Sequence, residues 1–343
     1  MSENAVAFVD YSYNRYSLAV LTGVLEEDHR FHDLSIYFLK HKELDTQIVE
    51  LSQHHKKLVV GFSFHTPNLL EMAATISGVR DRLTQDSSRN VLLIAGGPHP
   101  SGDPLGTLEM GINVVVVGEG EVTSPHLLEH YFSDADFQEV KGISYFRGED
   151  YHYTGRPTPI DLSDYAAFAP KHRRFSPIEI SRGCPWGCKF CQTPFLMGGR
   201  MRHRSIESIV KYAKIAKEHG LRDLRFITPV SFAYGSPDGK TVQLDTLEAM
   251  LKAVGEVFGK DHVYLGSFPS EVRPENVTPE TLELVKKYCA NDNIIIGAQS
   301  GSTSLLDSIH RGHGVEEVVN ATKLIVKAGL VANIDFIFGM PGE

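Results

Sequence analysis

The sequence predicts an α/β protein built from two parts, a doubly wound parallel sheet followed by an α/β barrel of incomplete length. Apolar strand-like runs alternate with amphipathic helical stretches in residues 1–133 and again after residue 176. The runs are almost uniformly apolar, which is typical of parallel strands buried on both faces. A hairpin pattern and a proline-rich stretch separate the two series. We therefore expect a first domain over residues 1–137, a hairpin and linker over 138–175, and a second domain over 176–343.

The first series fits five strand–helix units. In its first helix, Leu18 and Leu21 recur at a spacing that places them on one face. Residues 140–146 and 150–153 predict a β-hairpin that turns at Gly148. The expected strands are 5–9, 34–39, 58–64, 91–95 and 112–117, and the expected helices are 16–27, 43–54, 68–83, 103–110 and 123–132.

The second series has five strands, and each strand except the last is followed by a helix. Such a pattern predicts part of a (β/α)6 barrel, whose active face lies at the carboxyl ends of the strands. The sequence stops at Gly339–Glu343, directly after the fifth strand, and would leave that strand as a long apolar edge. We therefore expect a truncated barrel, with further residues supplying at least one more βα unit. The expected strands are 178–180, 223–228, 263–268, 293–298 and 331–338, and the expected helices are 206–219, 243–258, 279–289 and 315–328.

Composition narrows the class of protein. The 343 residues are 42% hydrophobic and 22% charged, as in soluble globular proteins that bury real cores. A net charge of −9 gives no basic surface for nucleic acid, so we expect no nucleic-acid partner. We find no apolar run of 18 residues and no secretory signal, and we expect no membrane partner. Three of the four cysteines are clustered, which argues against a disulfide framework and predicts a reducing, cytoplasmic location.

The clustered cysteines are Cys184, Cys188 and Cys191, in a C-x3-C-x2-C array at the end of the first barrel strand. Three thiolates in one loop suit a soft metal centre, and three protein ligands rather than four leave an open position. One alternative is a structural zinc site completed by His172 or His203, although zinc sites usually pair two cysteine units or add an H-x3-H. Another is a redox dithiol of Cys188 and Cys191, which the third cysteine disfavours.

Two features outside this loop are expected to be structural. Cys289 lies on an amphipathic helix and is expected to be a buried thiol. The segment His310-Arg-Gly-His313 is expected to be an exposed helix end rather than a metal site.

In its βα context, with the aromatic Phe190 just before the last cysteine, the loop resembles the radical S-adenosylmethionine (radical SAM) superfamily. The resemblance implies that the three cysteines hold a [4Fe-4S] cluster whose fourth iron binds the amino and carboxylate groups of SAM. It also implies that one electron cleaves SAM to a 5′-deoxyadenosyl radical, which abstracts a hydrogen atom. The cluster would make the protein oxygen-sensitive.

The same resemblance implies SAM contacts at the later strand ends. Residues 297–301 resemble the family segment that contacts the ribose and carboxylate of SAM, and residues 335–343 resemble the motif along the adenine. The sequence departs from the family after the second strand, where Thr228-Pro-Val-Ser231 replaces a glycine- or acid-rich motif for the SAM amino group. The expected SAM-binding residues are Phe190, Thr228, Ser267, Glu271, Arg273, Gln299 and Ser300.

A doubly wound, Rossmann-like domain ahead of such a barrel resembles the class B, cobalamin-dependent members. Small residues after the third, fourth and fifth strands would let the backbone lie against the cofactor. The family usually carries an aspartate and a histidine after the first strand for the lower cobalt ligand, but residues 10–16 contain Asp10 and no histidine. Alternatively, the glycines are only tight turns of a domain that has lost its cofactor. The expected cobalamin-binding residues are Ser63, His65, Gly96, Gly97, Pro98, Gly118, Glu119 and Gly120.

The resemblance implies an enzyme, most readily a cobalamin-dependent methyltransferase that acts on an unactivated carbon or phosphorus centre. One alternative is a radical SAM oxidation, cyclisation or rearrangement without methyl transfer, and another is a non-catalytic corrinoid- or metal-binding module. The expected partners are a small-molecule or peptide substrate and an electron donor such as ferredoxin or flavodoxin. The sequence identifies neither the substrate nor the residues that act on it.

Overall fold

The computed structural model describes residues 3–42, 44–86 and 90–343. The chain folds into two compact units, one formed by the residues up to Ile160 together with Phe168–Ser176 and the other by Asp161–Ala167 together with Pro177–Glu343. Among the described residues, no helix has the length and apolar character needed to cross a membrane. Glu43, the first residue of the predicted helix 43–54, lies outside the described residues.

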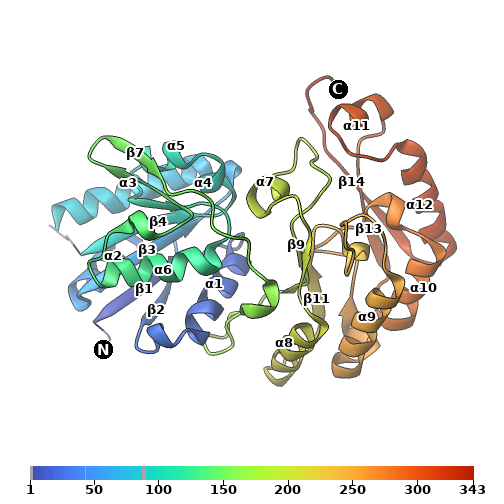
Figure 1. Ribbon diagram of the computed structural model, residues 1–343, viewed down its shortest axis with the longest axis horizontal. Coiled ribbons are helices and arrows are strands. Elements are labelled where there is room, and N and C mark those ends of the chain that lie inside the picture. Colours follow the sequence, from blue (N-terminus) through green and yellow to red (C-terminus); the bar gives the residue numbers. More distant parts are fainter. Residues whose placement is uncertain (1–2, 43, 87–89) are drawn as a thin grey trace. The chain divides into compact units, whose positions relative to one another are not determined.

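The first unit is built on a seven-stranded sheet with the order β2-β1-β3-β4-β5-β6-β7 (Figure 1). Its first five strands are parallel, and the chain moves outward from β1 first to β2 and then to β3, as a doubly wound sheet does. The predicted hairpin is present and extends the sheet, because β6 pairs antiparallel with β5. The strands are β1 (Asn4–Val9), β2 (Ser35–Leu39), β3 (Lys57–Ser63), β4 (Val91–Gly96), β5 (Val114–Val116), β6 (Ile143–Arg147) and β7 (Asp150–Tyr153).

Helices cover both faces of this sheet. Alternate residues of a strand point to opposite faces, so Ala5 and Ala7 pack in one core and Val6 and Phe8 in another. The predicted helix 103–110 corresponds to the second of two short helices, each of which begins with a proline at its first position. The helices are α1 (Arg15–Glu27), α2 (Leu44–His54), α3 (Leu69–Gln85), α4 (Pro98–Gly102), α5 (Pro104–Glu109) and α6 (Gly120–Phe132).

The second unit contains the five predicted strands as parallel neighbours in chain order. Strands β8, β11 and β12 form one ladder, and β13 and β14 form another. The two ladders are joined where the Ile295 N–H donates to the Gly266 carbonyl, 2.9 Å away, and where Val272 bridges to Ile296. The fold class predicted from the sequence is confirmed. The strands are β8 (Ile178–Glu179), β11 (Leu224–Ile227), β12 (Val263–Tyr264), β13 (Asn293–Gln299) and β14 (Val331–Phe336).

The connecting helices begin at local caps. Ser205 accepts a hydrogen bond from the Ser208 N–H at the start of α8, and Thr278 and Thr281 form a capping box at the start of α10. Four short helices and strands of this unit were not predicted, and they lie within the segments that follow β8 and β13. The main helices are α8 (Ile206–Glu218), α9 (Leu244–Phe258), α10 (Pro279–Tyr288) and α12 (Val315–Lys327); the unpredicted elements are β9 (Ser181–Arg182), α7 (Thr193–Met197), β10 (Arg202–His203) and α11 (Thr303–Ser308).

Candidate cluster and cofactor sites

The cysteine loop leaves β9 through Gly183 and packs against the segment that returns to β10. Gly183 has a φ of +85°, and a Cβ there would lie 2.2 Å from the Arg200 carbonyl oxygen, so only glycine fits. The Cys184 N–H donates to the Gly198 carbonyl at 3.1 Å, and the Cys191 N–H donates to the Cys188 carbonyl at 2.9 Å. These backbone bonds fold the loop so that the three thiols belong to one compact turn.

The thiols differ in exposure. Cys188 is buried, whereas Cys184 and Cys191 are partly exposed. Burial raises the pKa of the Cys184 thiol, and the neighbouring thiols Cys191 and Cys188 raise it further. No three His, Cys, Asp or Glu side chains of the described residues converge as the ligands of a single ion would. In a [4Fe-4S] cluster each cysteine binds a different iron, so the sulfurs need not converge on one point.

Two buried donors in this region also fit a cluster. The Trp186 indole N–H is buried and has no hydrogen-bond partner among the described residues, and the same holds for the Arg311 Nε–H. Buried donors normally find an acceptor. The sulfurs of an iron–sulfur cluster accept hydrogen bonds from the protein, so the three thiols and the two orphaned donors together suit such a group.

The histidines considered for a zinc site have other partners. His203 Nδ1 lies 2.8 Å from Ser181 Oγ, and its Nε2 lies 2.9 Å from the Ser236 carbonyl oxygen. His172 Nδ1 lies 2.7 Å from a Glu26 carboxylate oxygen. Both ring nitrogens of His203 and Nδ1 of His172 are therefore bonded to groups other than the cysteines, which disfavours the zinc alternative.

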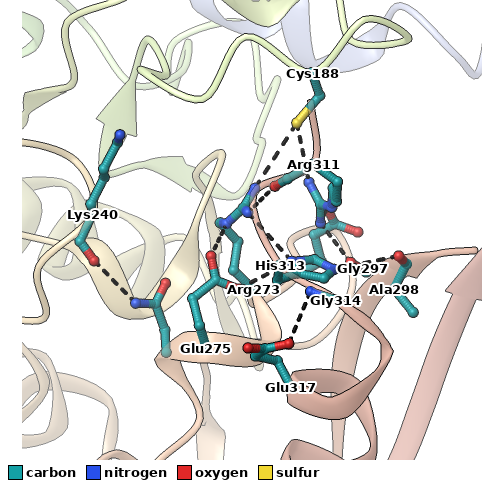
Figure 2. A network of polar contacts seen from close by, with 12 residues as sticks. Cys188, Lys240, Arg273, Glu275, Gly297, Ala298, Arg311, His313, Gly314 and Glu317 are labelled. Carbon is teal, nitrogen blue, oxygen red and sulfur yellow. Dashed lines mark hydrogen bonds and ion pairs between the residues drawn. The ribbon is translucent and has the colours of Figure 1, made fainter. Parts of the chain in front are cut away.

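Two arginines approach the buried cysteine. Arg311 Nη1 lies 3.6 Å and Arg273 Nη1 lies 4.0 Å from Cys188 Sγ (Figure 2). The sequence singled out Arg273 for SAM but not Arg311. The expectation that residues 310–313 form an exposed helix end is wrong, because Arg311 and His313 are buried. Their partners lie far away in the sequence, so no local pattern could have identified them.

Arg311 is held by groups at the end of β13. Its Nη2 donates to the Gly297 carbonyl at 2.6 Å and lies 3.7 Å from a Glu271 carboxylate oxygen. A Cβ at Gly297 would lie 2.6 Å from Arg311 Nη2 and 2.6 Å from the Glu271 carboxylate oxygens, so a glycine is needed here for Arg311 and Glu271 to lie this close to β13. Burial raises the pKa of Glu271, and the opposing positive charge of Arg311 offsets part of that effect.

The structure gathers some of the expected SAM-binding residues at the cysteine loop. Glu271 lies beside Arg311, and Arg273 approaches Cys188. The ring of Phe190, which is 39% exposed, lies 5.9 Å from the Arg311 guanidinium carbon. Gln299 ends β13 in a left-handed conformation with a φ of +74°.

The other three candidates use their hydroxyls within the fold. Thr228 Oγ1 donates to the Val230 carbonyl at 3.2 Å. Ser267 Oγ accepts from Arg225 at 3.5 Å, and Ser300 Oγ accepts from the Ser302 N–H at 3.1 Å. Their involvement with SAM remains a prediction.

The expected cobalamin-binding residues lie at the carboxyl edge of the first sheet. Gly97 follows β4 with a φ of +92°, and a Cβ there would lie 2.9 Å from Ser63 Oγ at the end of β3. Gly96 is the last residue of β4, and Pro98 is the first residue of α4. The glycine at position 97 therefore lets the loop after β4 pack closely against the end of β3.

The loop after β5 completes the same edge. The Gly118 N–H donates to Ser101 Oγ at 3.0 Å, and Gly120 is the first residue of α6. Glu119 is buried, and its carboxylate accepts a hydrogen bond from the Ile160 N–H at 3.0 Å. This contact gives Glu119 a structural task that the sequence did not reveal.

The loop after β1 stands where a lower cobalt ligand would be expected. Asp10 forms ion pairs with Lys40 at 2.6 Å and Arg174 at 2.9 Å. The rings of Tyr11 and Tyr13 stack with centroids 5.0 Å apart. His65, from the loop after β3, meets the Tyr13 ring edge-on at 6.0 Å, and burial lowers its pKa. This loop thus presents aromatic rings rather than an imidazole.

Comparison with known families gives one match in each part of the chain. The family model of the radical SAM superfamily matches residues 178–343, which include the cysteine loop and the strands behind it. Residues 178–343 therefore form a radical SAM domain. The family model of the B12 binding domain matches residues 5–128, the parallel part of the first unit. The cofactors of this radical SAM protein are accordingly a [4Fe-4S] cluster, SAM and cobalamin.

Two relatives are similar to most of this chain at low identity. The chain is 28% identical to a putative methylthiotransferase of Methanocaldococcus jannaschii over 68% of this chain and 51% of the relative. It is 26% identical to an uncharacterized methyltransferase of Pyrococcus horikoshii over 81% of this chain and 61% of the relative. The chain thus spans little more than half the length of these relatives.

Two solved structures share the fold at low identity. The radical S-adenosylmethionine methyltransferase TsrM from Kitasatospora setae superposes with a TM-score of 0.75 at 17% identity, covering 100% of this chain and 69% of TsrM. The cobalamin-dependent S-adenosylmethionine radical enzyme OxsB superposes with a TM-score of 0.75 at 17% identity, covering 98% of this chain and 49% of OxsB.

Proposed function

We propose that this chain catalyses cobalamin-dependent methyl transfer to an unactivated carbon or phosphorus centre. The observation that carries the proposal is the presence of a B12 binding domain and a radical SAM domain in one chain. The first supplies a methyl carrier and the second supplies a means of activating an inert position. The Pyrococcus horikoshii relative, named an uncharacterized methyltransferase, supports the same reaction class.

The groups bound by these domains supply a 5′-deoxyadenosyl radical from SAM and a corrinoid that carries a methyl group. The residues of the chain bind and orient them. Cys184, Cys188 and Cys191 would hold the cluster and leave one iron open for SAM. Glu271 and Arg311 place opposite charges beside that loop, where the amino and carboxylate groups of SAM need partners of opposite sign.

A second candidate reaction is methylthio transfer, which the Methanocaldococcus jannaschii relative favours. That reaction needs a sulfur donor in addition to the methyl donor. Three of the four cysteines belong to the cluster loop, and the fourth, Cys289, is buried with a pKa raised to about 12 by desolvation. The sulfur would therefore have to come from outside this chain, whereas the methyl carrier has a domain of its own.

The reaction class can be tested without knowing the substrate. The anaerobically reconstituted protein, loaded with cobalamin, is reduced and given SAM with an isotopically labelled methyl group. We expect the label on the corrinoid together with S-adenosylhomocysteine, and separately 5′-deoxyadenosine. Formation of 5′-deoxyadenosine alone would favour oxidation, cyclisation or rearrangement, and formation of neither product would favour a non-catalytic binding module.

A cluster variant separates the two activities. Cys184→Ala should abolish 5′-deoxyadenosine formation, because one iron ligand is lost, and should leave cobalamin binding intact. Retention of 5′-deoxyadenosine formation in this variant would contradict the cluster assignment.

The electron donor and the location form part of the proposal. A one-electron donor such as ferredoxin or flavodoxin would reduce the cluster, and a small molecule or peptide would be the substrate. The oxygen-sensitive cluster and the free thiols suit a reducing, cytoplasmic location. Reduction of the cluster by purified flavodoxin in place of a chemical reductant would test the first point.

A further inference from the structure

Trp186 lies between the first two cluster cysteines and is covered by two cations. The Arg273 guanidinium carbon lies 3.7 Å from the centre of the indole ring, and Lys240 Nζ lies 4.6 Å from it. Cations at these distances are attracted to the face of an indole, the best of the aromatic side chains for this contact. The Trp186 side chain therefore connects the cysteine loop with the loop that carries Lys240 and the loop that carries Arg273.

Two glycines allow these loops to close on the cysteine loop. A Cβ at Gly312 would lie 2.5 Å from the Trp186 ring, and a Cβ at Gly239 would lie 2.8 Å from Pro185. Both glycines also have positive φ values, of +79° and +70°. Loops that follow β11, β12 and α11 thus pack against Pro185 and Trp186, and any larger residue at either glycine would push them away.

Arg273 connects this packing to the cluster ligand. It is 2% exposed, and besides its approach to Cys188 Sγ it donates to Glu275 and to the Arg311 carbonyl. Glu275 is held in turn by His313, whose Nδ1 lies 3.1 Å from its carboxylate (Figure 2). The guanidinium therefore has a fixed orientation, with its face on the indole and one edge toward the sulfur.

We propose that Arg273 and Trp186 form a clamp that fixes the cysteine loop and raises the reduction potential of the cluster. Reduction adds one electron, and hence one negative charge, to the cluster. A buried positive charge beside a cysteine ligand stabilises the reduced state more than the oxidised state, and hydrogen bonds to the sulfur act in the same direction. Arg273 is thus a positioning residue that acts through Cys188, and Trp186 holds it in place.

This inference rests on the cluster and not on methyl transfer. The clamp would act in the same way in any radical SAM reaction, because every such reaction begins with reduction of the cluster. A failed methyl-transfer assay therefore leaves the proposal intact, and the measurement below leaves the reaction class undecided.

The test is a redox titration of the anaerobically reconstituted full chain, followed by the electron paramagnetic resonance signal of the reduced cluster. Arg273→Gln should lower the midpoint potential, because it removes the charge. Arg273→Lys should lower it less, because the charge remains but a lysine amine cannot stack and bond at once. The midpoint potential of Trp186→Phe should lie between that of the wild type and that of Arg273→Gln. Iron and sulfide content is measured for each variant.

Lys287→Gln is the matched control. It removes one positive charge from the same unit, but Lys287 lies on α10 with Glu248 and Tyr288 as partners. The midpoint potential of the cluster in Lys287→Gln should equal that in the wild type.

A wild-type potential in Arg273→Gln with full iron content would overturn the proposal. If Arg273→Gln fails to fold, an unchanged potential in both Arg273→Lys and Trp186→Phe would overturn it equally. A folded Arg273→Gln that loses iron, while Lys287→Gln retains it, would support the role of the clamp in fixing the loop.

Discussion

The strand edges of the two units, where we expect the cofactors to bind, differ in composition. At the first sheet the strand ends carry glycines, and Gly97 and Gly118 adopt positive φ values. At the second unit the strand ends carry buried charges, and Arg273, Glu271 and Arg311 converge beside the cysteine loop. The first edge is thus characterised by residues without side chains, and the second by buried charged side chains.

We attribute the difference to the ligands that we expect at the two edges. A corrinoid with a long nucleotide tail needs backbone that it can lie against, and a Cβ in the way would exclude it. An iron–sulfur cluster with SAM is compact and charged, and it needs thiolates and counter-charges held in a dry site. We therefore expect cofactor binding at the first edge to weaken when a glycine is replaced by a larger residue. At the second edge we expect it to weaken when a thiol or a charged group is removed.

The largest effect is expected from Cys188→Ala. Removing one of three cluster ligands should abolish cluster binding, since the other two thiols cannot hold three irons. Iron and sulfide analysis after anaerobic reconstitution measures this loss. Cys289→Ala, which also removes one thiol, should retain the full cluster content because Cys289 lies outside the loop. Equal iron content in the two variants would refute the assignment of the triad.

The first unit also contains a buried charge, which we expect to serve stability. Lys40 and Arg174 lower the pKa of Asp10 through hydrogen bonds and their charges, against the opposing effect of burial. Asp10→Asn should lower the free energy of unfolding by about 2 kcal/mol at pH 7, as expected for losing hydrogen bonds to charged groups. Urea denaturation of the two proteins gives this difference.

The pH dependence of that difference has a definite sign. Because the folded-state pKa of Asp10 is below its unfolded value of about 4, the contribution is present above pH 4 and lost as the pH falls through the folded-state pKa. The gap between wild type and Asp10→Asn should therefore narrow in acid. Asp136, an exposed partner of Arg147, provides a control, and Asp136→Asn should change stability little. A gap that widens in acid would contradict the ion-pair account.

A smaller effect is expected from Gly97→Ala. The added Cβ would contact Ser63 Oγ, and the positive φ costs roughly 1–2 kcal/mol for an L-residue. We expect cobalamin affinity to fall about tenfold, which corresponds to roughly 1.4 kcal/mol, as measured by absorbance titration. Gly148→Ala carries a similar φ strain in a hairpin turn with no neighbours. Unchanged affinity in Gly97→Ala, or equal losses in both variants, would place the cofactor elsewhere.

The smallest effect concerns thiol reactivity. Burial raises the pKa of Cys289 to about 12 and hides its sulfur, so it should resist iodoacetamide in the cluster-free folded protein. Cys184 and Cys191, which are partly exposed, should be alkylated first. Mass spectrometry of the peptides gives the order of labelling, and early modification of Cys289 would show that α10 opens more readily than its burial implies.

The sequence by itself determined the order of strands, the helices between them and the cysteine triad. These features depend on short-range patterns: apolar runs of five or six residues, helical spacing, and three cysteines within eight positions. Even Gly97 could be identified, because a glycine pair at a strand end has a local meaning.

Only the tertiary structure decided which side chains surround those features. Arg273 and Arg311 reach Cys188 across 85 and 123 positions of sequence, and Glu119 reaches Ile160 across 41. Thr228 and Ser267 looked suited to a ligand in the sequence, but their hydroxyls bond within the fold. The reason is physical, because periodicity fixes what each segment becomes, whereas the partner of a buried charge is set by how distant segments pack.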